Sequence, residues 1–182
     1  MGDPVIRLFV GFDLPSDLRD RLAAVGMGLP GAHWVPEDNL HMTLRFIGDV
    51  HEDVANDLHD ALLGIRGGAI AMTVAGLGTF ETGHRPHTLY AGVEKSDPLA
   101  RLQGKIEAAL VRAGQEPEGR KFTPHITLAK LRDTPASRLQ PFLAANALLR
   151  DSWTAERFTL FSSQLGAGDP VYTAEADYPL DK

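Results

Sequence analysis

Two short segments decide what this sequence can be: His41-Met42-Thr43-Leu44 and, almost half a chain length later, His125-Ile126-Thr127-Leu128. Each lies in a run of apolar and β-branched residues that predicts a strand. Because side chains on a strand alternate between two faces, each histidine shares a face with its threonine and the apolar residues point the opposite way. Each segment is therefore expected to present an imidazole and a hydroxyl together, anchored from behind by the hydrophobic core.

Two such pairs suit the cleavage of a phosphodiester by water. One proton must leave the attacking water and another must reach the departing alkoxide, and histidine can do either because its ordinary pKa is about 6.5. The hydroxyls of Thr43 and Thr127 can donate to the non-bridging oxygens and stabilise charge in the transition state. Two matches are improbable by chance in a chain with seven histidines, so we favour a catalytic interpretation over two ordinary strands.

Composition bounds the remaining choices. The 182 residues carry a net charge of −6, which is wrong for a protein that coats long stretches of duplex. The absence of cysteine excludes disulfides, thiol nucleophiles and Cys-zinc sites. No apolar run approaches the roughly 20 residues of a membrane span. We expect one domain over residues 1–182, with pseudo-repeat halves at about 1–90 and 91–182, in the cytoplasm.

Strand-like and helix-like segments are mixed without the regular alternation of a doubly wound sheet, which predicts an α+β fold. Residues 76–87 are rich in glycine and predict a loop or a bulged turn. The expected strands are 5–12, 34–36, 39–47, 70–75, 88–93, 125–131, 155–164 and 171–180, and the expected helices are 16–25, 51–65, 97–113 and 136–149.

The chain resembles the 2H phosphoesterases, and most closely the RNA 2′,3′-cyclic phosphodiesterases, also called 2′-5′ RNA ligase-like proteins. The resemblance rests on the paired motifs and on short sequence segments spread over nearly the whole chain. These segments include Arg7-Leu8-Phe9-Val10, Trp34-Val35, Leu89-Tyr90-Ala91-Gly92-Val93, Phe122-Thr123-Pro124 and Phe158-Thr159-Leu160-Phe161. Lys130 departs from the family pattern, where arginine is frequent; the charge is kept but bidentate contact with phosphate is lost.

The resemblance implies a two-lobed, pseudo-symmetric domain in which antiparallel sheets line a central groove and helices lie outside. It also implies a reaction, the hydrolysis of an RNA-terminal or nucleotide 2′,3′-cyclic phosphate to a 2′-phosphomonoester. In that reaction His41 is the proton donor, His125 is the proton acceptor, and neither a metal nor another cofactor takes part.

Several further residues are candidates for binding substrate. Arg45 follows Thr43 by two positions and would meet the phosphate if the strand stays regular; its alternative is a surface salt bridge. Lys130 and Arg132 are further candidate phosphate ligands, with the same alternative. The aromatic side chains of Phe46, Trp34 and Tyr90 could stack on a base, although aromatic residues in strands more often belong to the core.

Two alternatives to this function remain open. One is a nucleotide- or RNA-end-binding module that keeps the fold without turnover, and the other is a 2H phosphodiesterase for another cyclic or 2′-5′-linked nucleotide. The presence of both histidines and both threonines favours catalysis, because binding alone needs no titrating pair. Metal-assisted hydrolysis is disfavoured because the sequence offers no dense cluster of His, Asp and Glu. The expected partners are RNA 3′ ends or nucleotides with a cyclic phosphate, not a membrane, and we expect a monomer.

Overall fold

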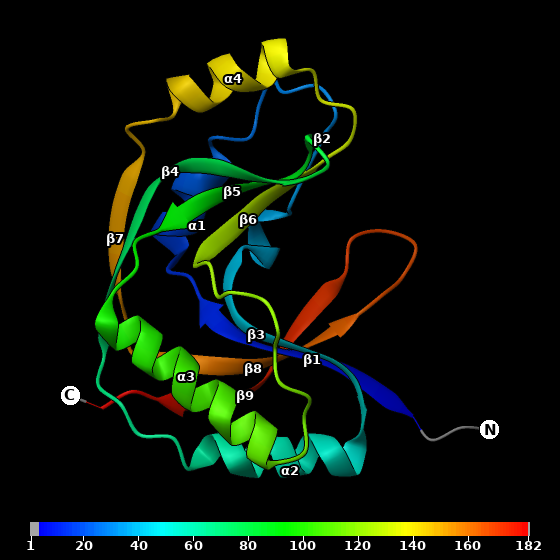
Figure 1. The fold of residues 1–182 in the computed structure, drawn as a ribbon, viewed down its shortest axis with the longest axis vertical. Helices are drawn as coiled ribbons and strands as arrows, with labels where there is room; N and C mark the ends of the chain where they lie inside the picture. The colour runs from blue at the N-terminus through cyan, green and yellow to red at the C-terminus, as the bar shows by residue number, and fades with distance from the viewer. Residues whose placement is uncertain (1–3, 182) are drawn as a thin grey trace.

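The computed structural model describes residues 4–181 and confirms the α+β class. Two antiparallel sheets lie in two lobes that share one continuous hydrophobic core (Figure 1). The four-stranded sheet has the order β3-β1-β8-β9 and consists of β1 (Val5–Asp13), β3 (His41–His51), β8 (Arg157–Gln164) and β9 (Val171–Pro179). The five-stranded sheet has the order β2-β6-β5-β4-β7 and consists of β2 (Ala32–Trp34), β4 (Ile70–Thr82), β5 (Arg85–Val93), β6 (His125–Leu131) and β7 (Arg150–Ala155).

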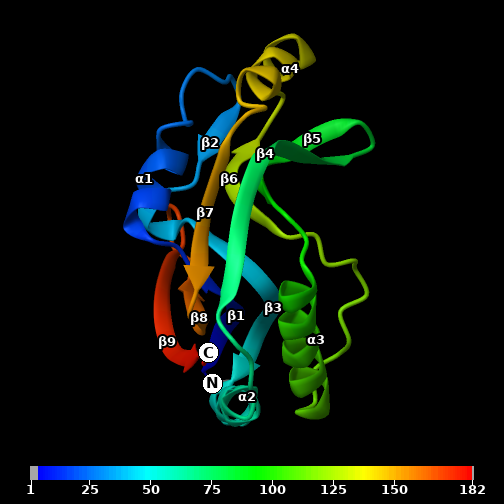
Figure 2. The ribbon, with the colours of Figure 1, turned by 90° about the vertical axis from the view of Figure 1, so that its left-hand side faces the viewer.

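Helices cover the outer sides of the two sheets. The four α-helices of the described chain are α1 (Ser16–Ala23), α2 (Glu52–Leu63), α3 (Asp97–Arg112) and α4 (Ala136–Ala145). Helices α2 and α3 pack against each other and against β3 of the four-stranded sheet, whereas α4 packs on β4 of the other sheet. As a result, α2 and α4 lie at opposite ends of the molecule in both views (Figures 1 and 2).

The two sheets do not coincide with the two halves of the sequence. The four-stranded sheet pairs β1, from the first half, with β8, from the second. The five-stranded sheet likewise pairs β5, which ends at Val93, with β6. Each lobe is therefore built from both halves of the chain, and the sequence repeat marks equivalent strands rather than separately folding units.

Both motif strands contain a β-bulge at the same place. In β3, Thr43 pairs with Gly11 but Arg45 pairs with Val10, which leaves Leu44 as the extra residue. In β6, Thr127 pairs with Tyr90 but Ala129 pairs with Leu89, which leaves Leu128 as the extra residue. A bulge shifts the alternation of side chains by one position. Directly after the leucine, the residues that face the core and those that face away are therefore exchanged in both strands; in β3 a second bulge follows at Ile47.

Several local predictions were wrong. Residues 76–87 form the half of the long β4–β5 hairpin that contains its turn, and a bulge falls where Gly76 adopts a φ of 70°. The strand β7 was missed because Arg150–Ala155 is short and mostly polar, and only its last residue is buried.

A glycine on β1 allows the first motif strand to approach closely. A Cβ added to Gly11 would lie 2.6 Å from the carbonyl oxygen of Met42, so the backbone would have to move. We expect Gly11→Ala to lower the free energy of unfolding by about 1–3 kcal/mol, the usual cost of overpacking a core. The matched control is Gly104→Ala, at an exposed position of α3 with open space around it, which should raise stability by about 0.5–1 kcal/mol.

Urea unfolding monitored by circular dichroism measures both free energies. Equal effects of the two substitutions would show that the close approach of β1 and β3 does not limit the position of the motif.

Candidate active site

The two motif strands belong to different sheets and approach each other in the interior. Their burial follows one pattern: the histidine is half-buried, the next residue is buried, the threonine is half-buried and the leucine is buried. Met42 and Ile126, which follow the histidines, are fully buried and anchor the two strands in the core. The structure thus brings the two predicted motifs to one place, with equivalent local environments.

A single kind of hydrogen bond orients both imidazoles. Nδ1 of His41 lies 2.7 Å from the carbonyl oxygen of Asn39, and Nδ1 of His125 lies 2.7 Å from that of Thr123. Because a carbonyl oxygen can only accept, Nδ1 carries the proton in both rings. When the imidazole is neutral, Nε2 is therefore the free base, and this atom is the one left for substrate.

Aromatic rings surround His41 and remove it from water. Phe9 lies 4.7 Å away and Tyr172 5.2 Å away, measured between ring centroids, and Phe161 completes the enclosure. Burial lowers the pKa of His41, although the bond to the Asn39 carbonyl opposes this shift. A positive charge on His125 lowers the pKa of His41 further, so the two imidazoles influence each other through their charges.

His125 has its own aromatic surroundings, on the five-stranded sheet. The ring of Phe80 stands edge-on to it at 4.8 Å, and Tyr90 lies 5.4 Å away. Burial lowers the pKa of His125, the bond to the Thr123 carbonyl opposes this, and the charge of Lys130 adds to the lowering. Both imidazoles therefore favour the neutral form more than an exposed histidine does.

Thr43 lies on the same face as its histidine. Its Oγ1 is 2.9 Å from Nε2 of His41, and in the neutral tautomer the hydroxyl donates to that nitrogen. Thr127 occupies the equivalent, half-buried position two residues after His125. Each lobe thus supplies one imidazole and one hydroxyl.

A pocket of about 410 Å³ opens between the two lobes beside these groups. Thr43 and Phe46 line it from β3, Phe80 and His87 from the β4–β5 hairpin, and His125 from β6. The segment before β6 contributes Glu118, Arg120, Lys121, Phe122 and Thr123. The volume falls within the usual range for small-molecule sites, and residues of both motifs reach it.

The prediction that Arg45 binds phosphate is not supported by its contacts. Its side chain is 7% exposed, and Nε lies 2.6 Å from Oε2 of Glu107. Nη1 donates to the carbonyl of Phe46 at 2.7 Å, and Nη2 donates to that of Glu116 at 2.5 Å. The bulge at Leu44 moves Arg45 off the face of Thr43, although Arg45 still contributes to the lining of the pocket, and it leaves Phe46 exposed there.

The equivalent bulge in β6 has the opposite consequence for Lys130. A regular strand would place Lys130 on the face opposite His125, but the bulge at Leu128 restores it to the side of the histidine. The ammonium group lies 3.5 Å from Oγ1 of Thr88, and its charge acts on His125. Arg132 lies beyond the end of β6 and is exposed.

The three aromatic candidates have different surroundings. The ring of Trp34 lies 6.0 Å from that of Phe142 and packs against the hydrophobic core, as the alternative interpretation expected. Tyr90 flanks His125, and Phe46 is 50% exposed at the pocket. Base stacking remains a prediction for Phe46 and Tyr90, and the position of Trp34 argues against it there.

Sequence reasoning missed the aromatic residues that enclose the histidines. Phe9, Phe161 and Tyr172 come from three strands of one sheet, and Phe80 comes from the segment expected to be a loop. One signal in the sequence was that Phe9 and Phe161 lie in segments that carry the family resemblance. Their contact with His41 depends on strand pairing between distant segments.

Two negative observations concern the described residues alone. Nowhere in residues 4–181 do three or more His, Cys, Asp or Glu side chains gather where they could hold a metal ion. Within the same range, no helix is both long and apolar enough to cross a membrane.

The sequence profile of the 2′-5′ RNA ligase superfamily matches residues 14–167, and the chain belongs to this superfamily. The resemblance to 2H phosphoesterases is thereby confirmed.

The chain is also similar to individual members of this group. It is 30% identical over 191 aligned positions to an RNA 2′,3′-cyclic phosphodiesterase of Aquifex aeolicus, covering 97% of this chain and 98% of the relative. A protein of the same name from Aeropyrum pernix is 36% identical over 116 residues, covering 63% of this chain and 64% of the relative. The crystal structure of Escherichia coli LigT complexed with 3′-AMP superposes with a TM-score of 0.81 at 26% identity, covering 98% of this chain and all of that one.

Because both imidazoles are shielded from water, we can predict how His41 and His125 titrate. Nitrogen-15 NMR of labelled histidine should show Nδ1 protonated in both neutral rings, with both midpoints below pH 6.5. In the unfolded chain these histidines take up protons near pH 6.5, whereas the folded chain does so only at lower pH. Stability is therefore complete above pH 6.5 and is lost as the pH falls from there toward the folded pKa values.

The double variant His41→Gln/His125→Gln should lose this part of the pH dependence. Midpoints at or above 6.5 in the native protein would mean that the rings are not desolvated as described.

Arg45 offers a second test, because a structural and a phosphate-binding role predict different losses. Arg45→Met leaves Glu107 without its partner, and should lower the free energy of unfolding by about 1–3 kcal/mol. This is below the usual 3–5 kcal/mol for breaking a buried pair, because Glu107 is partly exposed. The control Arg7→Met removes the exposed pair with Asp49 and should have a much smaller effect.

Urea unfolding compares the two variants. If Arg45→Met leaves the free energy of unfolding unchanged but weakens phosphate binding, Arg45 acts as a phosphate ligand and not as a structural residue.

Proposed function

We propose that this protein hydrolyses the 2′,3′-cyclic phosphate of an RNA 3′ end, or of a nucleotide, to a 2′-phosphomonoester. Water attacks the phosphorus, the bond to the 3′ oxygen breaks, and the 3′ hydroxyl is released. The observation that carries this proposal is the equivalence of the two imidazoles. Each has Nδ1–H bound to a carbonyl, which leaves Nε2 as the basic nitrogen, and each has a threonine two residues later; Nε2 of His41 accepts from the hydroxyl of Thr43. The relatives named RNA 2′,3′-cyclic phosphodiesterase support the same substrate.

In this proposal His125 accepts the proton of the attacking water. A general base must be neutral before it can act, and burial together with the charge of Lys130 favours the neutral form of His125. The bond from Nδ1 to the carbonyl of Thr123 stabilises the imidazolium that forms when Nε2 takes the proton.

His41 then donates a proton to the departing 3′ oxygen. Burial lowers its pKa, so a protonated His41 releases its proton readily in the enclosed site. An anionic phosphate bound beside the ring favours protonation before the reaction, because an opposite charge within a few ångströms stabilises the imidazolium. After transfer, the hydroxyl of Thr43 can again donate to the neutral Nε2.

The remaining groups hold the phosphate. Thr43 and Thr127 can donate to the two non-bridging oxygens from opposite lobes, and Lys130 adds positive charge beside His125. This assignment needs no metal, and we propose that none takes part.

Product analysis tests the function. An RNA that ends in a 2′,3′-cyclic phosphate should give a 2′-phosphate and a free 3′ hydroxyl, as read by phosphorus-31 NMR, and the rate should survive excess EDTA. Loss of activity that a divalent cation restores would contradict the metal-independent mechanism. Tight binding without turnover would favour the binding-module alternative, and turnover only on 2′-5′-linked or other cyclic nucleotides would change the substrate.

The two histidine roles can be separated by the leaving group. On a ribose cyclic phosphate, His41→Ala and His125→Ala should each slow turnover by roughly 10²–10⁴-fold, the usual scale of general acid–base catalysis. A nitrophenolate leaves without a proton, so on a nitrophenyl phosphodiester that the native protein accepts, His41→Ala should recover much of its rate while His125→Ala stays slow. The reverse pattern would exchange the roles, and equal recovery would remove the support for dividing them.

A further inference from the structure

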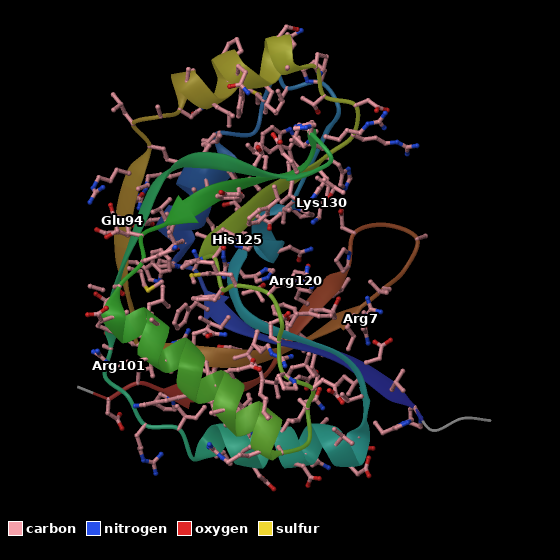
Figure 3. All side chains as sticks on the ribbon, viewed as in Figure 1. Arg7, Glu94, Arg101, Arg120, His125 and Lys130 are labelled. Carbon is pink, nitrogen blue, oxygen red and sulfur yellow. The ribbon has the colours of Figure 1, made fainter. Side chains whose placement is uncertain are left out.

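The segment that precedes the second motif carries two cations to the mouth of the inter-lobe pocket. Arg120 and Lys121 line the same pocket as Thr43 and His125, so the pocket extends from one motif residue of each lobe to these two side chains. Figure 3 shows Arg120 on this segment and His125 at the start of β6, with Lys130 further along the strand. None of the proposed catalytic steps uses Arg120 or Lys121.

A partly buried ion pair fixes the path of this segment. Glu107 of α3 binds Arg45 through Oε2 and accepts the amide of Glu118 through Oε1 at 2.9 Å. Arg45 also donates to the carbonyl of Glu116. The side chain of Glu118 accepts the amide of Arg120 at 3.0 Å. The backbone just before Arg120 is therefore held against both β3 and α3. These contacts fix the position from which the side chains of Arg120 and Lys121 extend.

The two cationic side chains themselves are available to a ligand. The side chain of Arg120 is 91% exposed, and its nearest acidic contact, from Nε to Glu118, is long at 3.6 Å. Lys121 is exposed as well. An exposed pair at this distance contributes little energy, so a phosphate can compete for the guanidinium.

We propose that Arg120 and Lys121 bind the phosphodiester immediately 5′ of the terminal nucleotide. This proposal rests on the proposed function and names its preferred substrate, an RNA end of two or more nucleotides rather than a cyclic mononucleotide. With the cyclic phosphate between the motifs, the pocket has room for one nucleoside among Phe46, Phe80 and Phe122. The next phosphate then reaches the mouth, where these two cations stand. Lys130 is not assigned to it, because its ammonium group lies 3.5 Å from Oγ1 of Thr88 and its side chain does not line this pocket.

Three substrates test this assignment. The first is a cyclic mononucleotide with a free 5′ hydroxyl. The second is a dinucleotide with the same 2′,3′-cyclic end, in which the upstream sugar is 2′-deoxyribose so that the internal linkage is inert. The third is that dinucleotide with an uncharged methylphosphonate in place of the internal phosphodiester. The quantity compared is kcat/KM for each substrate.

The native protein should prefer the charged dinucleotide over the mononucleotide by about 10-fold or more, and the methylphosphonate should abolish most of this preference. In the variant Arg120→Ala/Lys121→Ala the preference should fall to within about 2- to 3-fold of unity, with no further loss from the methylphosphonate. Added salt should weaken the native preference, because neutralising a phosphate releases counterions. The control Arg101→Ala removes an exposed cation of α3 that lines a different pocket, and should leave all three rates unchanged.

The outcomes separate this inference from the function on which it rests. Hydrolysis of no substrate by the native protein would contradict the proposed function. Hydrolysis of all three at equal rates, or a double variant that keeps the native preference, would overturn the assignment of Arg120 and Lys121 while leaving the function intact. A folded double variant that loses activity on every substrate equally would show that the segment acts on the catalytic groups instead.

Discussion

The site depends on one hydrogen bond that occurs twice, from imidazole Nδ1–H to the carbonyl oxygen two residues earlier. Without it, each ring could rotate or adopt the other tautomer, and Nε2 would not be held as the free base. The acceptor is backbone, so the orientation depends on how the chain leads into β3 and β6 rather than on a further side chain. Aromatic rings cover both imidazoles, and the resulting burial lowers the pKa of His41 and His125 together.

Much of this arrangement could be predicted from the sequence, because strand alternation places each histidine beside its threonine. Strand alternation predicted the wrong face of the strand for the residues immediately after the motifs. An extra residue, Leu44 or Leu128, exchanges the two faces, so Arg45 turns into a buried ion pair whereas Lys130 returns to the side of the histidine. A bulge is a property of two paired strands, and one strand read alone gives no sign of its position. The aromatic enclosure was missed for the same reason, since Phe80, Phe161 and Tyr172 reach the histidines only through strand pairing.

The two halves of the site are physically connected, because neither lobe is built from one half of the chain alone. Each sheet contains strands from both halves of the chain, and the pair of Arg45 and Glu107 links β3 to the segment that leads into β6. A net charge of −6 is no obstacle to an anionic substrate in such a molecule, because the charge that matters is local. Lys130 lies beside His125, and Arg120 and Lys121 line the pocket, while the global excess of Asp and Glu argues only against a protein that coats long stretches of duplex.

The central claim is that two buried imidazoles, one protonated and one neutral, act together on one phosphate. The measurement that tests it most directly is the dependence of kcat/KM on pH for a 2′,3′-cyclic nucleotide, which reports the ionisations of the free protein. Because burial lowers both pKa values, we expect a bell with two limbs and a maximum below pH 6.5, and its two apparent pKa values belong to the pair. A profile with a single limb, or a maximum above pH 7, would contradict the account.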